Sequence, residues 1–306
     1  MIRRGHIERG GAMYFLQQTV NGIAFGLVLA LFAVGFSLVL ANLGVFNIAH
    51  AAVFAAGPLI AYLLVIHLGV SVWLGWLIVI PLAAALNVFI YFVAVKPLRA
   101  RPDRELSTFA ACLGVLTALQ ALGDKLLNQQ VVRFPPAAFS VTSLHIGSLL
   151  VSNIQILMIV LSLVSFAGLA YVINRTFIGR QIRAVAFDRH ASEFLGVNSE
   201  LVTVVVFLVS GAMAALAAIP ISLAYNDISG ELGNEYIVLA MAVMVIGGFG
   251  SVYGTLAASV ALGVVNSLSA AYISSSYSEV IVFGALLLTL VVRPTGLSAN
   301  RQVDRV

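Results

Sequence analysis

The chain has 306 residues, of which 61% are hydrophobic and only 9% charged, and its mean hydropathy is +1.07. A soluble domain has roughly 45–50% apolar and 25% charged residues, so this composition excludes an ordinary soluble protein. The formal net charge of +4 comes from basic residues between apolar stretches, a pattern that indicates membrane orientation and not nucleic-acid binding. The single cysteine, Cys112, can form neither a disulfide framework nor a metal cluster and is interpreted as a small core residue.

Apolar stretches long enough to cross a bilayer recur along the whole chain. A bilayer core of roughly 30 Å requires about 20 helical residues. We therefore predict an all-α fold, a polytopic transmembrane helical bundle that forms a single domain over residues 1–306. Nine spans are counted, with eight or ten also compatible, at 14–41, 45–66, 71–95, 106–127, 152–174, 201–224, 236–249, 254–272 and 279–292.

The N-terminal residues 1–13 conflict with this count. They contain Arg3, Arg4 and Arg9, yet nine spans place them outside, against the positive-inside rule. One interpretation is that translation starts at Met13, so that residues 1–13 are an extension. The other is that a broken or re-entrant element between residues 14 and 66 changes the count.

Two polar residues interrupt the apolar stretch "LGVFNIAHAAVFAAG", residues 43–57. On a continuous helix Asn47, His50, Phe54 and Gly57 share one face, because their spacings are three, four and three residues. One hypothesis is that Asn47 and His50 only hydrogen-bond to neighbouring helices. The other is that this face lines or gates a path through the membrane, since polar groups turn away from lipid.

The charged loops predict the orientation of the spans. Loops 96–104 and 175–200 are rich in Arg and Lys, are separated by two spans, and are predicted to be cytoplasmic. The external loop 128–151 should contain a short hairpin, and the acidic segment 225–236 should also be external. By the same parity the C-terminus, with Arg293, Arg301 and Arg305, is cytoplasmic.

Packing between the helices should rely on small residues. Ser259, Gly263, Ser267 and Ala271 recur every four residues and predict one contact face, and Gly211 with Ala215 predicts another. The glycine-rich stretch "IGGFGSVYG", residues 246–254, predicts a tight turn.

The longest predicted internal loop, residues 175–200, mixes apolar and charged residues. This mixture predicts one or two short amphipathic helices that lie parallel to the membrane. Such helices could rest on lipid headgroups, or they could fit a groove on a separate cytoplasmic subunit.

The chain resembles the LivH-type permeases of branched-chain amino acid ABC importers along nearly its whole length from residue 14. The matching stretches begin with "YFLQQTVNGIAFGLVLALFAVGFSLV" and "LGVFNIAHAAVFAAG", continue with "GRQIRAVAFDRHASEFLGVNSELVTVVVFLVSGAMAALAA" and "VMVIGGFGSVYGTLAASVALGVV", and end with "LVVRPTGLSA". The resemblance implies that residues 179–198 transmit motion from an ATPase. The residues on the family pattern there are Gly179, Arg183, Ala184, Gly196 and Val197, and Arg189 of the same loop is a further coupling candidate.

The resemblance also implies partners and a location. They are a LivM-like second permease, two ATP-binding subunits, a periplasmic substrate-binding protein and the bilayer of a bacterial inner membrane. The chain itself is expected to need no cofactor and no metal and to catalyse no reaction. Ala51 and Ala52 stand where a Gly and an acidic residue are common in the family, which leaves branched-chain or other hydrophobic amino acids, urea and short amides open as solutes.

Two rival functions are less favoured. A secondary transporter would couple through ionisable groups within the spans, but nearly all charged residues, Asp124 and Glu279 included, map to loops or helix ends. An intramembrane enzyme would need an acid–base pair or a metal cluster at depth, and His50 has no carboxylate or second histidine near it in its span.

Overall fold

The structure is a computed structural model that describes residues 2–135, 139–146, 149–248 and 250–292. Its elements are α1 (Ile2–Leu43), α2 (His50–Leu68), α3 (Val72–Ile90) with a π-helical turn (Tyr91–Val95) and a 3-10 turn (Lys96–Leu98), α4 (Arg104–Leu126), β1 (Ser143–Ile146), β2 (Leu149–Ser152), α5 (Asn153–Arg175), α6 (Phe177–Phe187), α7 (Arg189–Phe194), α8 (Ser199–Tyr225), α9 (Leu232–Gly247), α10 (Val252–Tyr272) and α11 (Ser275–Val292).

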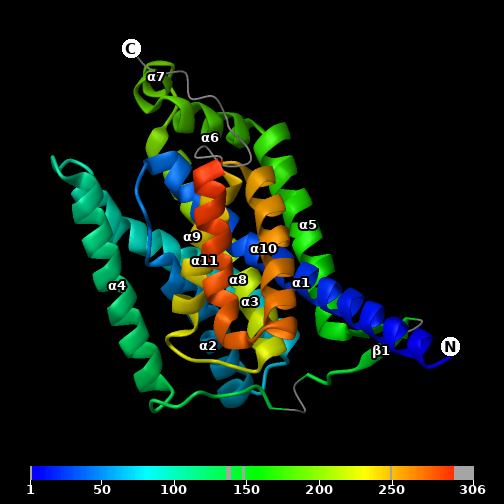
Figure 1. The fold of residues 1–306 in the computed structure, drawn as a ribbon. Helices are drawn as coiled ribbons and strands as arrows, with labels where there is room; N and C mark the ends of the chain where they lie inside the picture. The colour runs from blue at the N-terminus through cyan, green and yellow to red at the C-terminus, as the bar shows by residue number, and fades with distance from the viewer. Residues whose placement is uncertain (1, 136–138, 147–148, 249, 293–306) are drawn as a thin grey trace.

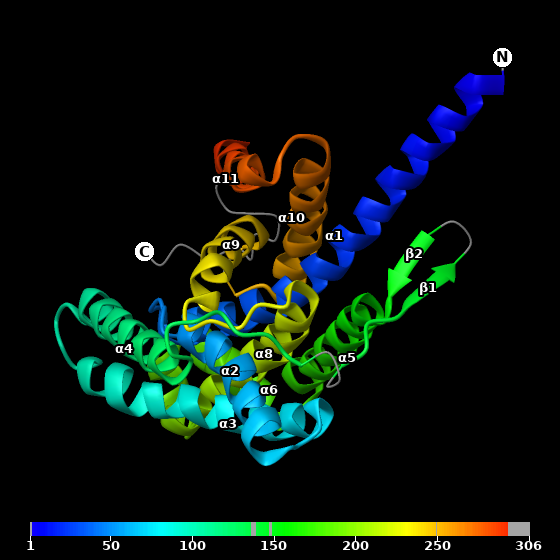
Figure 2. The same ribbon diagram turned by 90° about the horizontal axis from the view of Figure 1, so that it is seen from below.

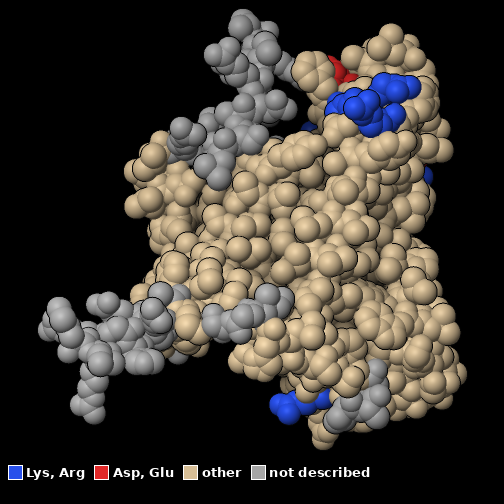
Figure 3. Space-filling model, turned by 90° about the vertical axis from the view of Figure 1, so that its right-hand side faces the viewer, with Lys and Arg blue, Asp and Glu red and all other residues tan. Residues whose placement is uncertain are grey.

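The helices form a bundle in which α8 and the C-terminal part of α1 lie inside, α4 stands at the edge, and the N-terminal part of α1 projects outward (Figures 1 and 2). Among the described residues, seven helices are long and apolar enough to cross a membrane, and the two shorter apolar helices Leu232–Gly247 and Val280–Val292 match the remaining predicted spans. The all-α transmembrane bundle is therefore confirmed. The surface in Figure 3 shows an uncharged band between the two ends of the bundle, with Lys and Arg gathered mainly at one end.

The two basic loops meet at one end of the bundle, which we call the α6–α7 end. Glu200, in the first turn of α8, pairs with Lys96 at 2.9 Å and with Arg99 at 3.4 Å. The predicted loop 175–200 folds into the two short helices α6 and α7 (Figure 1). The prediction that both loops share one side is confirmed.

The opposite end, which we call the hairpin end, carries the antiparallel strands β1 and β2. The predicted hairpin is therefore confirmed. Val132 and Ile228 exchange backbone hydrogen bonds of 3.1 and 3.0 Å, so the predicted external segments 128–151 and 225–236 meet here. The early part of α1 lies at the same end, because the Gln17 side chain bonds the backbone of Leu150 in β2. Arg293, Arg301 and Arg305 lie outside the described residues.

The connection between α1 and α2 departs from the prediction. Residues 44–49 are not helical, and α2 begins at His50 instead of residue 45. Asn47 lies in the preceding turn, where its carbonyl accepts the His50 N–H at 3.0 Å. The prediction that Asn47 shares a helical face with His50, Phe54 and Gly57 is therefore wrong, because the buried amide of Asn47 bonds α3 and holds the chain in a turn.

This connection is a buried re-entrant segment. The His50 ring bonds the carbonyl of Phe32, about three helical turns before the end of α1 at Leu43, so α2 starts well inside the bundle. Non-helical backbone at this depth is tolerated only where protein surrounds it, and Asn47 and Ala49 are fully buried. The segment leaves the span parity unchanged, since Tyr62 of α2 packs against Phe134 at the hairpin end.

The predicted small-residue contacts join the central helices. Ser259 donates to the carbonyl of Gly26 at 2.7 Å, and Gly263 lies against Gly22 and Gly26 so closely that a β-carbon there would overlap their backbone. Gly211 lies in the same way against the backbone of Ala83 in α3. These close approaches fix α1 against α10 and α3 against α8.

Candidate functional site

The first candidate region is a buried polar cluster at the start of α2. The Asn47 amide donates to Asn87 at 3.3 Å, and the Asn87 amide donates to the carbonyl of Phe207 at 2.8 Å. Asn47, His50 and Asn87 are each at most 1% exposed. One chain of hydrogen bonds therefore joins the re-entrant segment, α3 and α8.

His50 is held on both ring nitrogens. Its Nε2 lies 3.3 Å from the carbonyl of Phe32, and its Nδ1 lies 3.3 Å from the Ser210 hydroxyl. A carbonyl only accepts, so in the neutral ring Nε2 donates to Phe32 and Nδ1 accepts from Ser210. The ring also stacks on Phe32, with 4.7 Å between centroids and 9° between planes.

Phe54 and Gly57 continue this packing along α2. Phe54 contacts the rings of Phe32 and Tyr236, and Gly57 lies against α8 at Ala218. The contacts of Asn47, His50, Phe54 and Gly57 are those expected if this region only packs against neighbouring helices. None of the four residues proposed to line a path borders either of the two cavities at the hairpin end. Their role in a path therefore stays a prediction.

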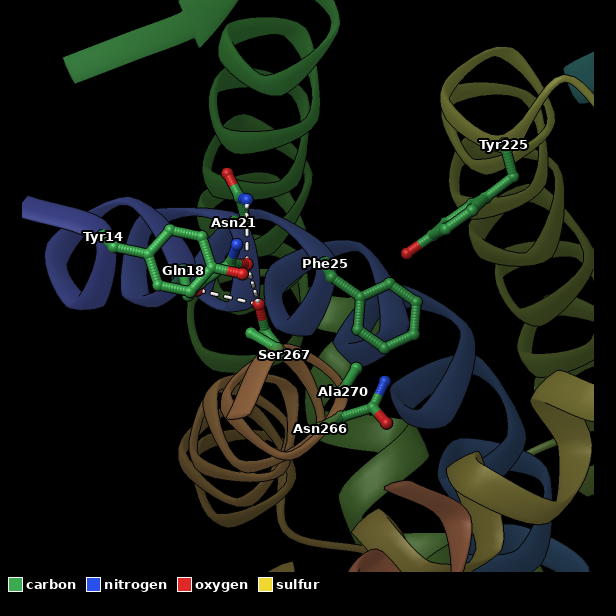
Figure 4. Close-up of a pocket in the computed structure, with 9 residues that line it drawn as sticks. Tyr14, Gln18, Asn21, Phe25, Tyr225, Asn266, Ser267 and Ala270 are labelled. Atoms are coloured by element: carbon green, nitrogen blue, oxygen red, sulfur yellow. Dashed lines mark hydrogen bonds between the residues drawn. The ribbon is translucent and has the colours of Figure 1, made fainter. Parts of the chain in front are cut away.

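The second candidate region consists of two cavities at the hairpin end. One, of about 350 Å³, lies between α1, α10 and the end of α8. The other, of about 700 Å³, lies between α1, α5, residues 134–135 and 139–141, and the same end of α8. Asn21, Phe25 and Tyr225 line both. In Figure 4, Phe25 and Tyr225 flank the smaller cavity, and Asn266 and Ala270 approach it from α10.

Amide side chains connect the walls of these cavities. The Asn21 oxygen accepts from Gln17 at 3.1 Å and from Gln155 at 2.7 Å, and the Asn21 amide donates to Gln18 at 3.2 Å. Ser267 of α10 donates to the backbone carbonyl of Gln18 at 2.9 Å (Figure 4). Asn21 is thus the centre of a network that joins α1, α5 and α10.

The third candidate region is the α6–α7 end, where the coupling candidates lie. Gly179 packs against the last turn of α5 so closely that a β-carbon would overlap the carbonyls of Val172 and Ile173. Thr176 caps α6 by accepting the Gly179 N–H at 3.1 Å, and the Arg183 guanidinium donates to the carbonyl of Ile173. Ala184, on α6, is exposed. Gly179 and Arg183 therefore attach α6 to α5.

The other coupling candidates shape α7. Arg189 pairs with Glu193 at 3.0 Å. Gly196 has a φ of +82°, and its N–H bonds Glu193 while the Val197 N–H bonds Ser192, a Schellman closure of the helix. This closure presents large apolar side chains at the tip, where Phe194 is 92% and Leu195 is 85% exposed.

Several residues that the structure brings together were not predicted from the sequence. Tyr91 donates to Glu200 at 2.8 Å and accepts from Arg99 at 2.7 Å, which ties the π-helical turn after α3 to the start of α8. Asn87, like Asn47, is an amide residue within an apolar stretch of the sequence, so the same criterion could have identified it. Gln17 and Asn21 could have been found from their helical spacing of four.

Comparison with known proteins agrees with this architecture. Residues 18–291 match the family described as "Branched-chain amino acid transport system / permease component". The chain is 30% identical to the high-affinity branched-chain amino acid transport system permease protein BraD of Pseudomonas aeruginosa, over 96% of this chain and 98% of that protein. It is likewise 30% identical to the permease protein LivH of Salmonella typhimurium, with the same coverage of each chain.

One solved structure shares the fold. A chain of PsaBC from Streptococcus pneumoniae in complex with Fab superposes with a TM-score of 0.50 at 12% identity, covering 96% of this chain and 97% of that chain. This likeness concerns the fold alone. By its match over residues 18–291 and its two full-length relatives, the chain belongs to the branched-chain amino acid transport permease family.

Proposed function

We propose that the chain is the membrane-spanning permease subunit of an ATP-binding-cassette importer for branched-chain or other hydrophobic amino acids. The observation that carries the proposal is the α6–α7 end in a chain of this family. Two short helices attached to the bundle present Phe194 and Leu195 almost fully to the surroundings. Exposed large apolar side chains at the tip of a rigid element suit a groove on a partner protein.

The partner at this tip would be an ATP-binding subunit, with two such subunits in the assembly and ATP hydrolysed on them. Motion of α6 and α7 would reach the bundle by two routes. Gly179 and Arg183 connect α6 to the end of α5, and Glu200 connects the start of α8 to Tyr91, Lys96 and Arg99. The second route ends at a π-helical turn, a feature often found at functional sites.

In this proposal each remaining partner has a place relative to the two ends of the bundle. A periplasmic substrate-binding protein would deliver solute at the hairpin end, and a LivM-like second permease would complete the path. The protein would then lie in a bacterial inner membrane with the α6–α7 end and the C-terminus in the cytoplasm. The basic loops at that end support this orientation through the positive-inside rule.

The solute class is supported by the charges of the described interior. Among the described residues, neither cavity has an Asp, Glu, Lys or Arg in its lining, which suits a zwitterionic or uncharged small solute. Urea and short amides share that chemistry with amino acids. A direct comparison of leucine, urea and acetamide uptake in the same preparation would separate these solutes.

The test of the proposal is reconstitution in proteoliposomes with the second permease, the ATP-binding subunits and the binding protein. We expect uptake of leucine only with ATP and with the ATP-binding subunits present. Uptake by the permease without those subunits, driven by a proton or sodium gradient, would overturn the proposal in favour of a secondary transporter.

A variant at the tip makes this test sharper. Phe194→Glu places a charge in the proposed apolar contact and should reduce co-purification of the ATP-binding subunits. Tyr272→Glu is a control for an exposed aromatic residue at the hairpin end and should leave co-purification unchanged. Equal co-purification of the Phe194 variant and the wild type would count against the docking role of α7.

A further inference from the structure

The two cavities at the hairpin end have the size and lining of a small-molecule site. Their volumes of about 350 and 700 Å³ lie in the range of roughly 300–1,000 Å³ that ligand pockets occupy. They adjoin through the shared side chains of Asn21, Phe25 and Tyr225, so one set of residues faces both spaces.

The polar groups of the lining are all uncharged. Asn21, Gln18 and Gln155 supply amides, and Tyr14 and Tyr225 supply hydroxyls. The side-chain amide of Asn266 has no hydrogen-bond partner among the described residues and lies next to the Phe25 ring (Figure 4). An amide offers both donors and an acceptor, so this lining can bond an ammonium group and a carboxylate at once.

Large apolar side chains also line the cavities. Phe25 lies between the two cavities, and Phe134, Phe139 and Met158 line the larger one. These side chains can cover an aliphatic group of a bound solute. A solute with a net charge would find no counter-charge among the described residues of the lining.

The same network is attached to the hairpin. Gln17 donates to the Leu150 carbonyl at 2.7 Å and accepts from the Leu150 N–H at 3.0 Å. Gln17 also donates to Asn21, and Gln155, in the first turn of α5 after β2, donates to Asn21 as well. A protein that binds the hairpin would therefore act directly on a residue that lines both cavities.

We propose that these cavities form a solute-binding site of the permease, at which a zwitterionic amino acid with an aliphatic side chain binds after it leaves the binding protein. The site rests on the proposed function. The amides of Asn21 and Asn266 bond the ammonium and carboxylate groups, and Phe25 covers the side chain. The hairpin influences the position of Asn21 through Gln17, which bonds both Leu150 of the hairpin and Asn21.

The test is ATP-driven uptake of leucine by the reconstituted complex, with three variants that change the cavity in different ways. Ala270→Phe fills the smaller cavity, Asn266→Leu removes the unpartnered amide at equal size, and Asn21→Asp places a carboxylate opposite the carboxylate of the solute. The Asn266 and Asn21 variants should lower the uptake rate at limiting leucine by about tenfold or more, since losing a hydrogen bond to a charged group has about that effect. Ala270→Phe should lower it at least as much, because its ring occupies the space of the solute.

Matched controls make the same changes elsewhere. Ala110→Phe lies at an exposed position of α4, and Asn174→Leu and Asn174→Asp change an exposed amide at the opposite end of the bundle. All three should keep uptake within about twofold of the wild type, since surface substitutions have small effects. Co-purification of the ATP-binding subunits shows that each variant assembles. Because Asn21 also supports Gln17 and Gln155, the Ala270 and Asn266 variants keep the test valid if the Asn21 variant does not fold.

The outcomes separate the two proposals. Wild-type uptake in the assembled Ala270→Phe and Asn266→Leu variants would overturn the binding site and leave the importer intact. Absence of ATP-driven uptake of leucine, urea and acetamide by the wild-type complex would overturn the proposed function, and the site would fall with it.

Discussion

Asn87 is the residue on which the buried polar cluster depends. Its amide bonds partners on both sides, the Asn47 side chain and the Phe207 carbonyl, and is fully buried itself. Interhelical hydrogen bonds in membranes stabilise by only about 0.6 kcal/mol on average, but an orphaned buried group costs more. A single amide can therefore decide how α2, α3 and α8 fit together.

The first prediction concerns this amide. Asn87→Leu should lower the free energy of unfolding by about 1–3 kcal/mol, because it leaves the buried Asn47 side-chain amide without its partner and removes the side-chain hydrogen bond to the Phe207 carbonyl. The measurement is thermal unfolding in detergent, with Asn174→Leu as the matched control at an exposed amide. Equal unfolding temperatures for both variants would contradict the role of the cluster.

The second prediction separates packing from a path at His50. His50→Leu should lower the unfolding temperature, since the Ser210 hydroxyl loses its bond to the ring, the Phe32 carbonyl loses its side-chain hydrogen bond and the stacked ring is removed. Uptake per assembled complex should stay near the wild-type value, because both ring nitrogens already have partners within the protein. Loss of uptake in a stably assembled variant would instead support a role of His50 in the path.

At the scale of elements, the geometry of α7 depends on one backbone conformation. Gly196 has a φ of +82°, in the left-handed region, and its N–H closes the helix onto Glu193. Gly69 at the end of α2 is a close counterpart at the hairpin end, with a φ of +61° and an N–H that bonds Leu64. The two glycines allow the same substitution to be compared at the two ends of the bundle.

The third prediction uses this pair. Gly196→Pro should leave the bundle folded but abolish ATP-coupled uptake, because proline cannot adopt the left-handed conformation and lacks the N–H that bonds Glu193. Gly69→Pro introduces the same strain at the other end and should keep measurable coupling between ATP hydrolysis and uptake. Similar loss of coupling in both variants would show that general destabilisation, and not the form of α7, is responsible.

The fourth prediction concerns the link between α3 and α8. Glu200→Lys should reduce coupling of ATP hydrolysis to uptake, because it repels Lys96 and Arg99 and separates the start of α8 from the π-helical turn. Loss of the ion pairs alone should change stability by only about 1 kcal/mol or less, since Lys96 and Glu200 are 49% and 38% exposed at their side chains. Adding Lys96→Glu should restore part of the coupling, and a failure to do so would contradict a direct link.

At the scale of the whole molecule, the orientation can be measured with single cysteines. In a Cys112→Ala background, Ser143→Cys in the hairpin should react with a membrane-impermeant maleimide applied from the periplasm, because the hairpin end faces outward in the proposed assembly. Ala186→Cys, at an exposed position of α6, should react only after the inner membrane is opened. The reverse pattern would invert the orientation proposed from the basic loops.

The apolar helices were predictable from sequence, seven of them long enough to span a membrane among the described residues, whereas their contacts were not. A span can be recognised in the sequence because it needs about 20 consecutive, mostly apolar residues. The hairpin can be recognised from the alternation of apolar and polar residues in its strands. The start of α2 was mispredicted because Asn47 bonds Asn87, a residue 40 positions away. The cavity network was missed for the same reason, since Gln17 and Leu150 are 133 positions apart. The position of the coupling helices came from the family resemblance and their amphipathic pattern.

The re-entrant segment before α2 has a consequence for how the protein is made. During synthesis α2 enters the membrane long before α8 exists, and the partner of His50 on α8, Ser210, follows 160 residues later. Until then Nδ1 of the imidazole lacks its partner, at a depth where lipid offers none, although the Phe32 carbonyl of α1 and Asn87 of α3 are already available to His50 and Asn47. We expect α2 to remain incompletely docked in nascent chains that end before residue 199, and to reach its final position only when α8 is inserted. Assembly of the core would thus be a late, post-insertion event, so ribosome-bound intermediates would expose this segment to quality-control proteases.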